Sequence, residues 1–222
     1  LLPNYFKTAE VNEFKWVVLV LLIDVAHVYS TLYRTYFNKN MWQHSRLLLY
    51  AIPLITFLVS VMLYTISSFW FWRVMAYVAV FHFIRQQYGF MRLYSRKEIQ
   101  SKLEFWIDKL VIYVATIYPI LFWHLSSDRS FNWFVEGDFL LVKSNYLLAA
   151  STILYYIIVV VYLVKTLVQL AKLKTVNIPK QLVIIGTLAS WYFGIVFFNG
   201  DLTFTLLNVV SHGIPYMALI WI

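Results

Sequence analysis

Seven stretches of predominantly apolar residues dominate this sequence. They cover residues 16–34, 47–66, 70–90, 105–125, 145–166, 179–198 and 203–222. A helix of roughly 20 apolar residues is long enough to cross the hydrocarbon core of a bilayer. Because the connections leave no room for a soluble domain, the sequence predicts an all-α bundle of seven transmembrane helices that forms a single domain over residues 1–222.

The composition is that of a membrane protein, and it restricts the available chemistry. Hydrophobic residues make up 62% of the chain and charged residues only 13%, too few for the polar surface of a soluble domain. The chain has no cysteine, which excludes disulfides, thiolate metal sites and thiol catalysis. The net charge of +8 is typical of cytoplasmic loops that face anionic lipid. We therefore expect membrane lipids as partners and no nucleic acid.

The distribution of lysine and arginine predicts the orientation of the bundle. Basic residues gather in the connections that follow the first, third and fifth segments: Arg34, Lys39, Arg46, Arg92, Arg96, Lys97, Lys102, Lys172 and Lys180. By the positive-inside rule these connections are cytoplasmic, so the N-terminus lies outside. We expect a multi-pass protein of a bacterial inner membrane. The apolar ending YMALIWI favours a piece of a longer chain or a subunit of a membrane complex.

Three of the five histidines fall inside predicted helices. His27, His82 and His212 lie in the first, third and seventh segments, which run in the same direction. At about 1.5 Å per residue, each imidazole lies roughly 13–18 Å from the start of its helix, near the middle of a hydrocarbon core about 30 Å thick. The sequence therefore predicts three histidines at a common depth, where polar groups without partners are costly.

Each of these histidines has polar neighbours on its own helix face. They are Asp24, three residues before His27; Arg85 and Gln86, three and four residues after His82; and Asn208, four residues before His212. A bundle that buries the three faces together would enclose one polar site. Gln87 points to another side of its helix, and we interpret it as an interhelical contact.

Three interpretations of this cluster are open at the level of sequence. Neutral imidazole is a common metal ligand, so the histidines could hold a non-haem iron that activates oxygen, or two of them could bind a haem axially. Alternatively, the same residues could relay protons or ions in a transporter. They could also join helices by hydrogen bonds in a structural subunit of a larger complex.

The placement of the histidines resembles that of the Brp/Blh-type membrane carotene dioxygenases. His27 matches the first histidine of that family, His82 the second, and His212 the later member of a pair four residues apart. Asn208 stands where the family has the earlier member of the pair, and DVAHVYST places the acid before the histidine rather than after it. The resemblance implies a helical membrane fold, an iron held by histidines and oxidative cleavage of a carotenoid.

The leading hypothesis is therefore a metal-dependent oxygenase, most simply an iron enzyme, that acts on a lipid-soluble molecule such as a carotenoid or another isoprenoid. Its expected metal ligands are His27, His82, His212 and Asn208, and its expected catalytic groups are Asp24, Arg85 and Gln86. The alternative is a non-enzymatic transporter or structural subunit that uses the same residues.

Overall fold

A computed structural model describes residues 2–126, 129, 131–173 and 176–221 of the chain. The described part is helical and contains no β-strand. The first and last residues of the predicted domain, 1 and 222, lie outside the described ranges. Because the described part is helical throughout its long segments, the predicted all-α fold is confirmed.

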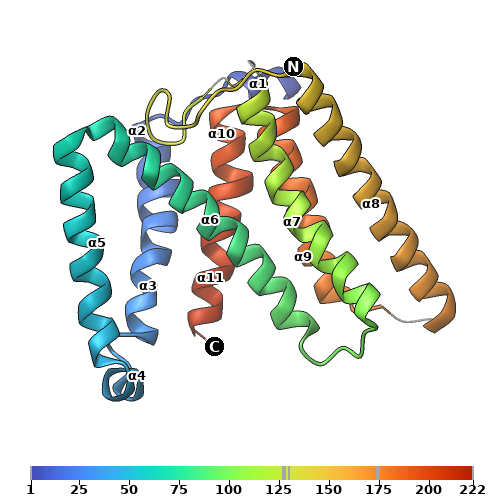
Figure 1. The fold of residues 1–222 in the computed structure, drawn as a ribbon, viewed down its shortest axis with the longest axis horizontal. Coiled ribbons are helices and arrows are strands. Elements are labelled where there is room, and N and C mark those ends of the chain that lie inside the picture. Colours follow the sequence, from blue (N-terminus) through green and yellow to red (C-terminus); the bar gives the residue numbers. More distant parts are fainter. Residues whose placement is uncertain (1, 127–128, 130, 174–175, 222) are drawn as a thin grey trace.

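The elements follow one another as an up-and-down bundle (Figure 1). In chain order they are α1 (Leu2–Thr8), α2 (Glu13–Lys15), η1 (Trp16–Val25), α3 (Ala26–Arg34), α4 (Lys39–His44), α5 (Arg46–Ile66), α6 (Ser68–Ser95), α7 (Lys102–Leu125), α8 (Asn145–Leu173), α9 (Ile178–Trp191), η2 (Tyr192–Phe197), α10 (Asp201–Phe204), η3 (Thr205–Val210) and α11 (Ser211–Trp221). Here η marks a π-helical stretch. The runs α2–η1–α3, α9–η2 and α10–η3–α11 are each continuous.

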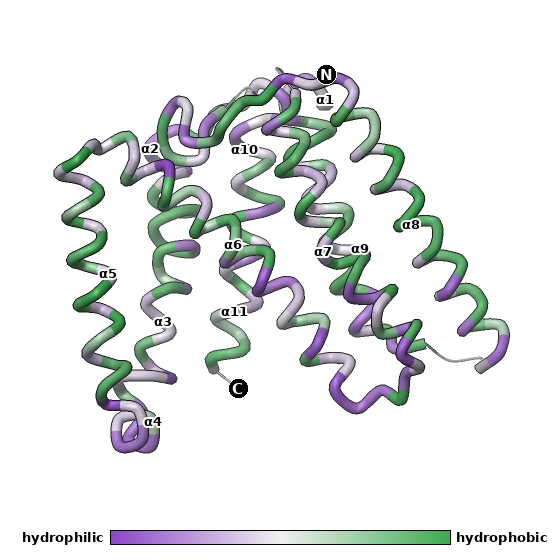
Figure 2. Tube along the Cα trace, in the orientation of Figure 1, coloured by the Kyte–Doolittle hydropathy of each residue, from purple (hydrophilic) through white to green (hydrophobic). Residues whose placement is uncertain are grey.

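Each of the seven predicted segments is a helical run, and six runs are long and apolar enough to cross a membrane. The protein is accordingly a multi-pass membrane protein. The exception is α6, which has the length but not the apolarity. Figure 2 shows the difference: α5 and α8 are hydrophobic along most of their length, whereas hydrophilic residues interrupt α6 well inside its ends.

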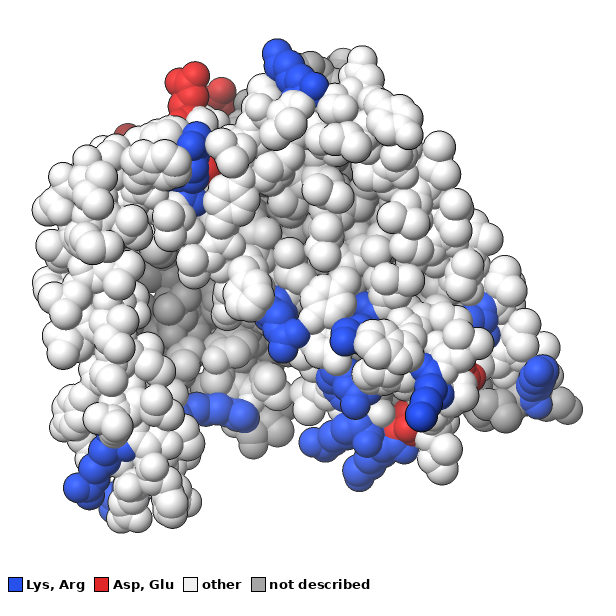
Figure 3. All heavy atoms as spheres, viewed as in Figure 1, with Lys and Arg blue, Asp and Glu red and all other residues white. Residues whose placement is uncertain are grey.

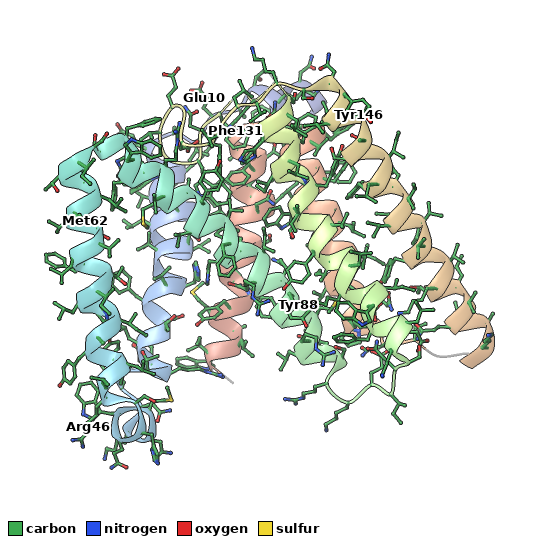
Figure 4. All side chains as sticks on the ribbon, viewed as in Figure 1. Glu10, Arg46, Met62, Tyr88, Phe131 and Tyr146 are labelled. Atoms are coloured by element: carbon green, nitrogen blue, oxygen red, sulfur yellow. The ribbon has the colours of Figure 1, made fainter. Side chains whose placement is uncertain are left out.

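The helices pack around α6, α7 and α9. α7 contacts α6, α8 and α9, while α11 contacts α3 and η3 contacts η1. α5 and α8 form the two flanks of the molecule (Figure 1). α5 buries only Leu49 among its described side chains, and Figure 4 shows Met62 pointing outward from it. Such a face is suited to lipid rather than to water.

An aromatic cluster closes the bundle at the end where α7 finishes and α10 begins. It includes Trp123, Phe139 and Phe204, which are 1%, 4% and 4% exposed. The connection from α7 to α8 folds over this end and supplies Phe131, which Figure 4 labels, and also Trp133. Burial of large rings here stabilises the end of the bundle, because each ring removes a large apolar area from water.

Candidate functional site

The fold brings His27, His82 and His212 together. One ligand nitrogen from each lies within 4.8 Å of the other two. His27 Nε2 and His212 Nε2 are 3.2 Å apart, and the His82 ring centroid lies 5.0 Å from that of His212. α3, α6 and α11 each supply one ring, so the predicted common depth of the three histidines is confirmed.

The three rings differ in burial. His27 and His212 are 3% and 0% exposed, whereas His82 is an exposed residue. His82 therefore forms the open side of the cluster, and the other two rings form its closed side. A buried imidazole needs partners for both nitrogens, since an unpaired polar atom in an apolar interior is costly.

Asp24 lies beside His27, as the three-residue spacing predicts. Its Oδ1 is 3.3 Å from His27 Nδ1, close enough for an ion pair, although the angle is not that of a hydrogen bond. η1 ends at Val25, so Asp24 stands in the last wide turn before α3. The acid is placed on the Nδ1 side of His27, and Nε2 is left to face His212.

His212 is held by α6 on two sides. The Phe83 ring stacks on the imidazole with centroids 3.7 Å apart, and Gln86 Nε2 donates to the His212 carbonyl oxygen at 2.8 Å. Gln86 therefore joins α6 to α11 next to the cluster, which agrees with its predicted place near the histidines. Its Oε1 has no hydrogen-bond partner among the described residues.

Asn208 is directed at η2. Its Oδ1 would lie 2.1 Å from a Cβ atom added to Gly194, so any side chain at that position would force Asn208 to move. The amide is 1% exposed, and neither of its polar atoms has a hydrogen-bond partner in the described part of the chain. Asn208 lies within η3 and His212 just after it, and the wider turns of η3 change the register that a four-residue spacing would otherwise give.

Arg85 is directed toward α7. Its guanidinium donates to the Tyr113 hydroxyl and lies 5.3 Å from the centre of the Tyr88 ring, which Figure 4 shows on α6. None of the ion pairs described for the chain includes Arg85. Gln87 Oε1 lies 3.0 Å from Thr187 Oγ1 on α9, and this contact confirms its predicted interhelical role.

A second polar cluster, not predicted from the sequence, lies where α7, α8 and α9 meet the α6–α7 connection. Lys180 Nζ is 2.8 Å from both Glu98 Oε1 and Asp108 Oδ2. Lys165 Nζ is 2.7 Å from Asp108 Oδ1. Two cations and two carboxylates therefore balance. Asp108 and Lys180 are 2% and 0% exposed, so the network is an internal one.

Gln100 and Asn177 complete this network. Gln100 Nε2 donates to Asp108 Oδ2, and Asn177 Nδ2 donates to Glu98 Oε2. A sequence signal for the network does exist: Asp108 is an isolated acid inside an apolar segment. This signal does not reveal the network, because its partners, Lys165 and Lys180, lie in stretches typical of the basic ends of membrane segments.

The geometry supports two kinds of chemistry at the histidine cluster. Neutral imidazoles that converge on one point can bind a metal ion, and imidazoles in contact can exchange a proton. The connection from α7 to α8 reaches this site indirectly, since the Trp133 ring packs on Phe83 with centroids 5.3 Å apart. Comparison of the chain with protein-family models, with curated proteins and with solved structures finds no match.

Proposed function

We propose that this protein is a membrane-embedded, metal-dependent oxygenase that acts on a lipid-soluble substrate of the isoprenoid or carotenoid class. The observation that carries the proposal is the convergence of His27, His82 and His212 from three separate helices within 4.8 Å. Three imidazoles at one depth in an apolar bundle are costly to maintain, which favours a role beyond packing.

The donor set fits a transition metal. Two ligands held at about 2.1 Å, at angles between 90° and 109°, lie roughly 3.0–3.4 Å apart. The His27 and His212 nitrogens, at 3.2 Å, fall in that range. The widest nitrogen separation is bounded by 4.8 Å, about 1.4 Å beyond the upper end of that range. Rotation of the exposed His82 ring toward the other two rings would close this gap.

His27, His82 and His212 would hold an iron, which would supply oxygen activation. Asp24 would hold the proton of His27 at Nδ1 and so keep the Nε2 lone pair free, which is the usual function of a carboxylate behind a metal-binding histidine. Gln86 would fix the backbone at His212. Asn208 remains a proposed additional ligand, and Arg85 a proposed substrate contact, each needing a change of side-chain direction.

The surroundings of the cluster support access from the lipid. His82 is exposed, and the aromatic cluster packs the end of the bundle beyond Phe83.

Lysine and arginine gather at the end of the molecule that carries α4 and the α6–α7 connection (Figure 3). This favours a cytoplasmic position for that end and an N-terminus outside, as in the inner membrane of a bacterium.

Metal analysis of the protein purified under gentle conditions tests the proposal. We expect about one equivalent of a transition metal in the wild type and in His44→Ala, an exposed histidine of α4. His27→Ala, His82→Ala and His212→Ala should each lose it. If the wild type holds no stoichiometric metal or haem, the oxygenase proposal is wrong.

A second candidate is a polar relay in a transporter or in a subunit of a membrane complex. The direct contact between His27 Nε2 and His212 Nε2 favours it, because at 3.2 Å one of the two nitrogens can donate its proton to the other. Together with Asp24 this makes a chain of three titratable groups. The metal analysis separates the two candidates, because the oxygenase needs a bound metal and the relay does not.

A further inference from the structure

A second site lies between α6, α9 and α11, apart from the histidines. A groove of about 700 Å³ runs there, which is within the range of small-molecule sites. The groove lies on another side of α11 from the histidine cluster. Ser211 and Pro215 line the groove, whereas His212 and Tyr216 pack on His27 of α3.

The groove is apolar along most of its length and polar at one end. α6 and α11 run in one direction and α9 in the other (Figure 1). The residues that line the groove therefore separate by depth. Its amide and aliphatic hydroxyl side chains lie toward the middle of the bundle: Gln87, Thr187, Ser190 and Ser211. The other end, near Tyr94 and Pro179, is lined mainly by hydrophobic residues.

The Gln87 amide has an unused donor. Thr187 Oγ1 lies 2.7 Å from the Val183 carbonyl oxygen and 3.0 Å from the Gln87 amide. An amide NH₂ group carries two N–H donors, and Thr187 accounts for at most one of them in either orientation of the amide. No other hydrogen bond to the Gln87 side chain is present in the described part of the chain. An unpaired N–H that faces an apolar groove in a membrane costs free energy until an acceptor binds.

We propose that this groove binds an elongated isoprenoid of the quinone class, with a ring carbonyl accepting a hydrogen bond from the Gln87 amide and the chain lying along the apolar lining. A carbonyl suits the site better than a hydroxyl, because it is an acceptor only and brings no further hydrogen that needs a partner. The site is independent of the histidine cluster and of any metal there.

Binding of decylubiquinone to the purified full chain in lipid nanodiscs tests this assignment, with decylbenzene as a probe that has the chain but no carbonyl. Gln87→Leu should weaken quinone binding about tenfold and leave decylbenzene unchanged, as expected for one lost hydrogen bond. Gln43→Leu is the matched control. It makes the same change at an exposed glutamine of α4 that does not line the groove, so quinone binding should change less than twofold.

Two glycines provide a steric test of the same site. A Cβ at Gly186, which lines the groove, meets nothing within 4 Å, and the same holds for Gly89, which does not line it. Gly186→Phe should abolish binding of both probes, and Gly89→Phe should change neither. Equal quinone affinities in Gln87→Leu and wild type would overturn carbonyl recognition. Unchanged binding in Gly186→Phe would overturn the location.

Discussion

Replacing Asp108 by Asn should destabilise this protein more than most single substitutions, because one carboxylate holds two buried lysines. Its Oδ1 is 2.7 Å from Lys165 Nζ, and its Oδ2 is 2.8 Å from Lys180 Nζ. Asparagine removes the charge and leaves only Glu98 to balance two cations. Removal of one partner from a buried pair costs about 3–5 kcal/mol. For a chain of this size that corresponds to a fall in Tm of roughly 6–20 °C.

The double variant Asp108→Asn/Lys165→Met tests whether charge balance is the cause. It leaves the pair of Lys180 and Glu98, whose atoms are 2.8 Å apart, and so restores neutrality. We expect it to regain at least half of the lost Tm in thermal unfolding followed by circular dichroism in one detergent. Lys172→Met, on the exposed end of α8, is the matched control and should change Tm by less than 2 °C, which corresponds to about 0.5 kcal/mol. If the two substitutions of the double variant are additive, the reasoning is wrong.

Three further predictions concern other contacts. Gly194→Ala should destabilise the fold by about 1–3 kcal/mol, because the added Cβ clashes with Asn208 Oδ1. In a double-mutant cycle, Asn208→Ala should relieve this clash, and additive effects of the two substitutions would contradict the contact. Arg129→Met should leave the fully buried Asp138 without its ion pair and lower stability by about 3 kcal/mol. It should also speed proteolysis of the α7–α8 connection, whereas Lys143→Met should change neither stability nor proteolysis. Gln86→Leu should weaken metal retention about tenfold in competition with a chelator and lower Tm by only a few degrees. Equal metal retention in Gln86→Leu and wild type would show that Gln86 does not support the site.

Apolar periodicity and length were sufficient to predict every long helix. The seven predicted segments differ from the observed runs mainly at their ends. α6, for example, begins at Ser68 instead of residue 70 and continues to Ser95 instead of residue 90. The extension carries Arg92 and Ser95, and an argument from hydropathy ends a helix where polar residues begin. Helix ends depend on caps and on packing, which a count of apolar residues does not contain.

The convergence of the three histidines could be predicted because depth follows directly from residue number in a straight helix. The direction in which each side chain points could not be predicted in the same way. Arg85 is drawn to Tyr113 and Tyr88 by neighbours that no single segment reveals. Asn208 is placed against Gly194 across two π-helical stretches, whose wide turns have no clear sequence signature. The buried network around Asp108 was missed for a related reason, since its members come from four separate parts of the chain.

The polarity of α6 has a consequence for how this protein is made. A segment that carries arginine, histidine and glutamine inside its length gains too little from hydrocarbon to enter a bilayer alone. Its preceding neighbour, α5, is apolar and joined to it through Ser67. We therefore expect the translocon to release α5 and α6 as a hairpin, with α6 retained near the channel until α7, α9 and α11 have been synthesised. The order of biogenesis would then follow from the same residues that build the histidine site.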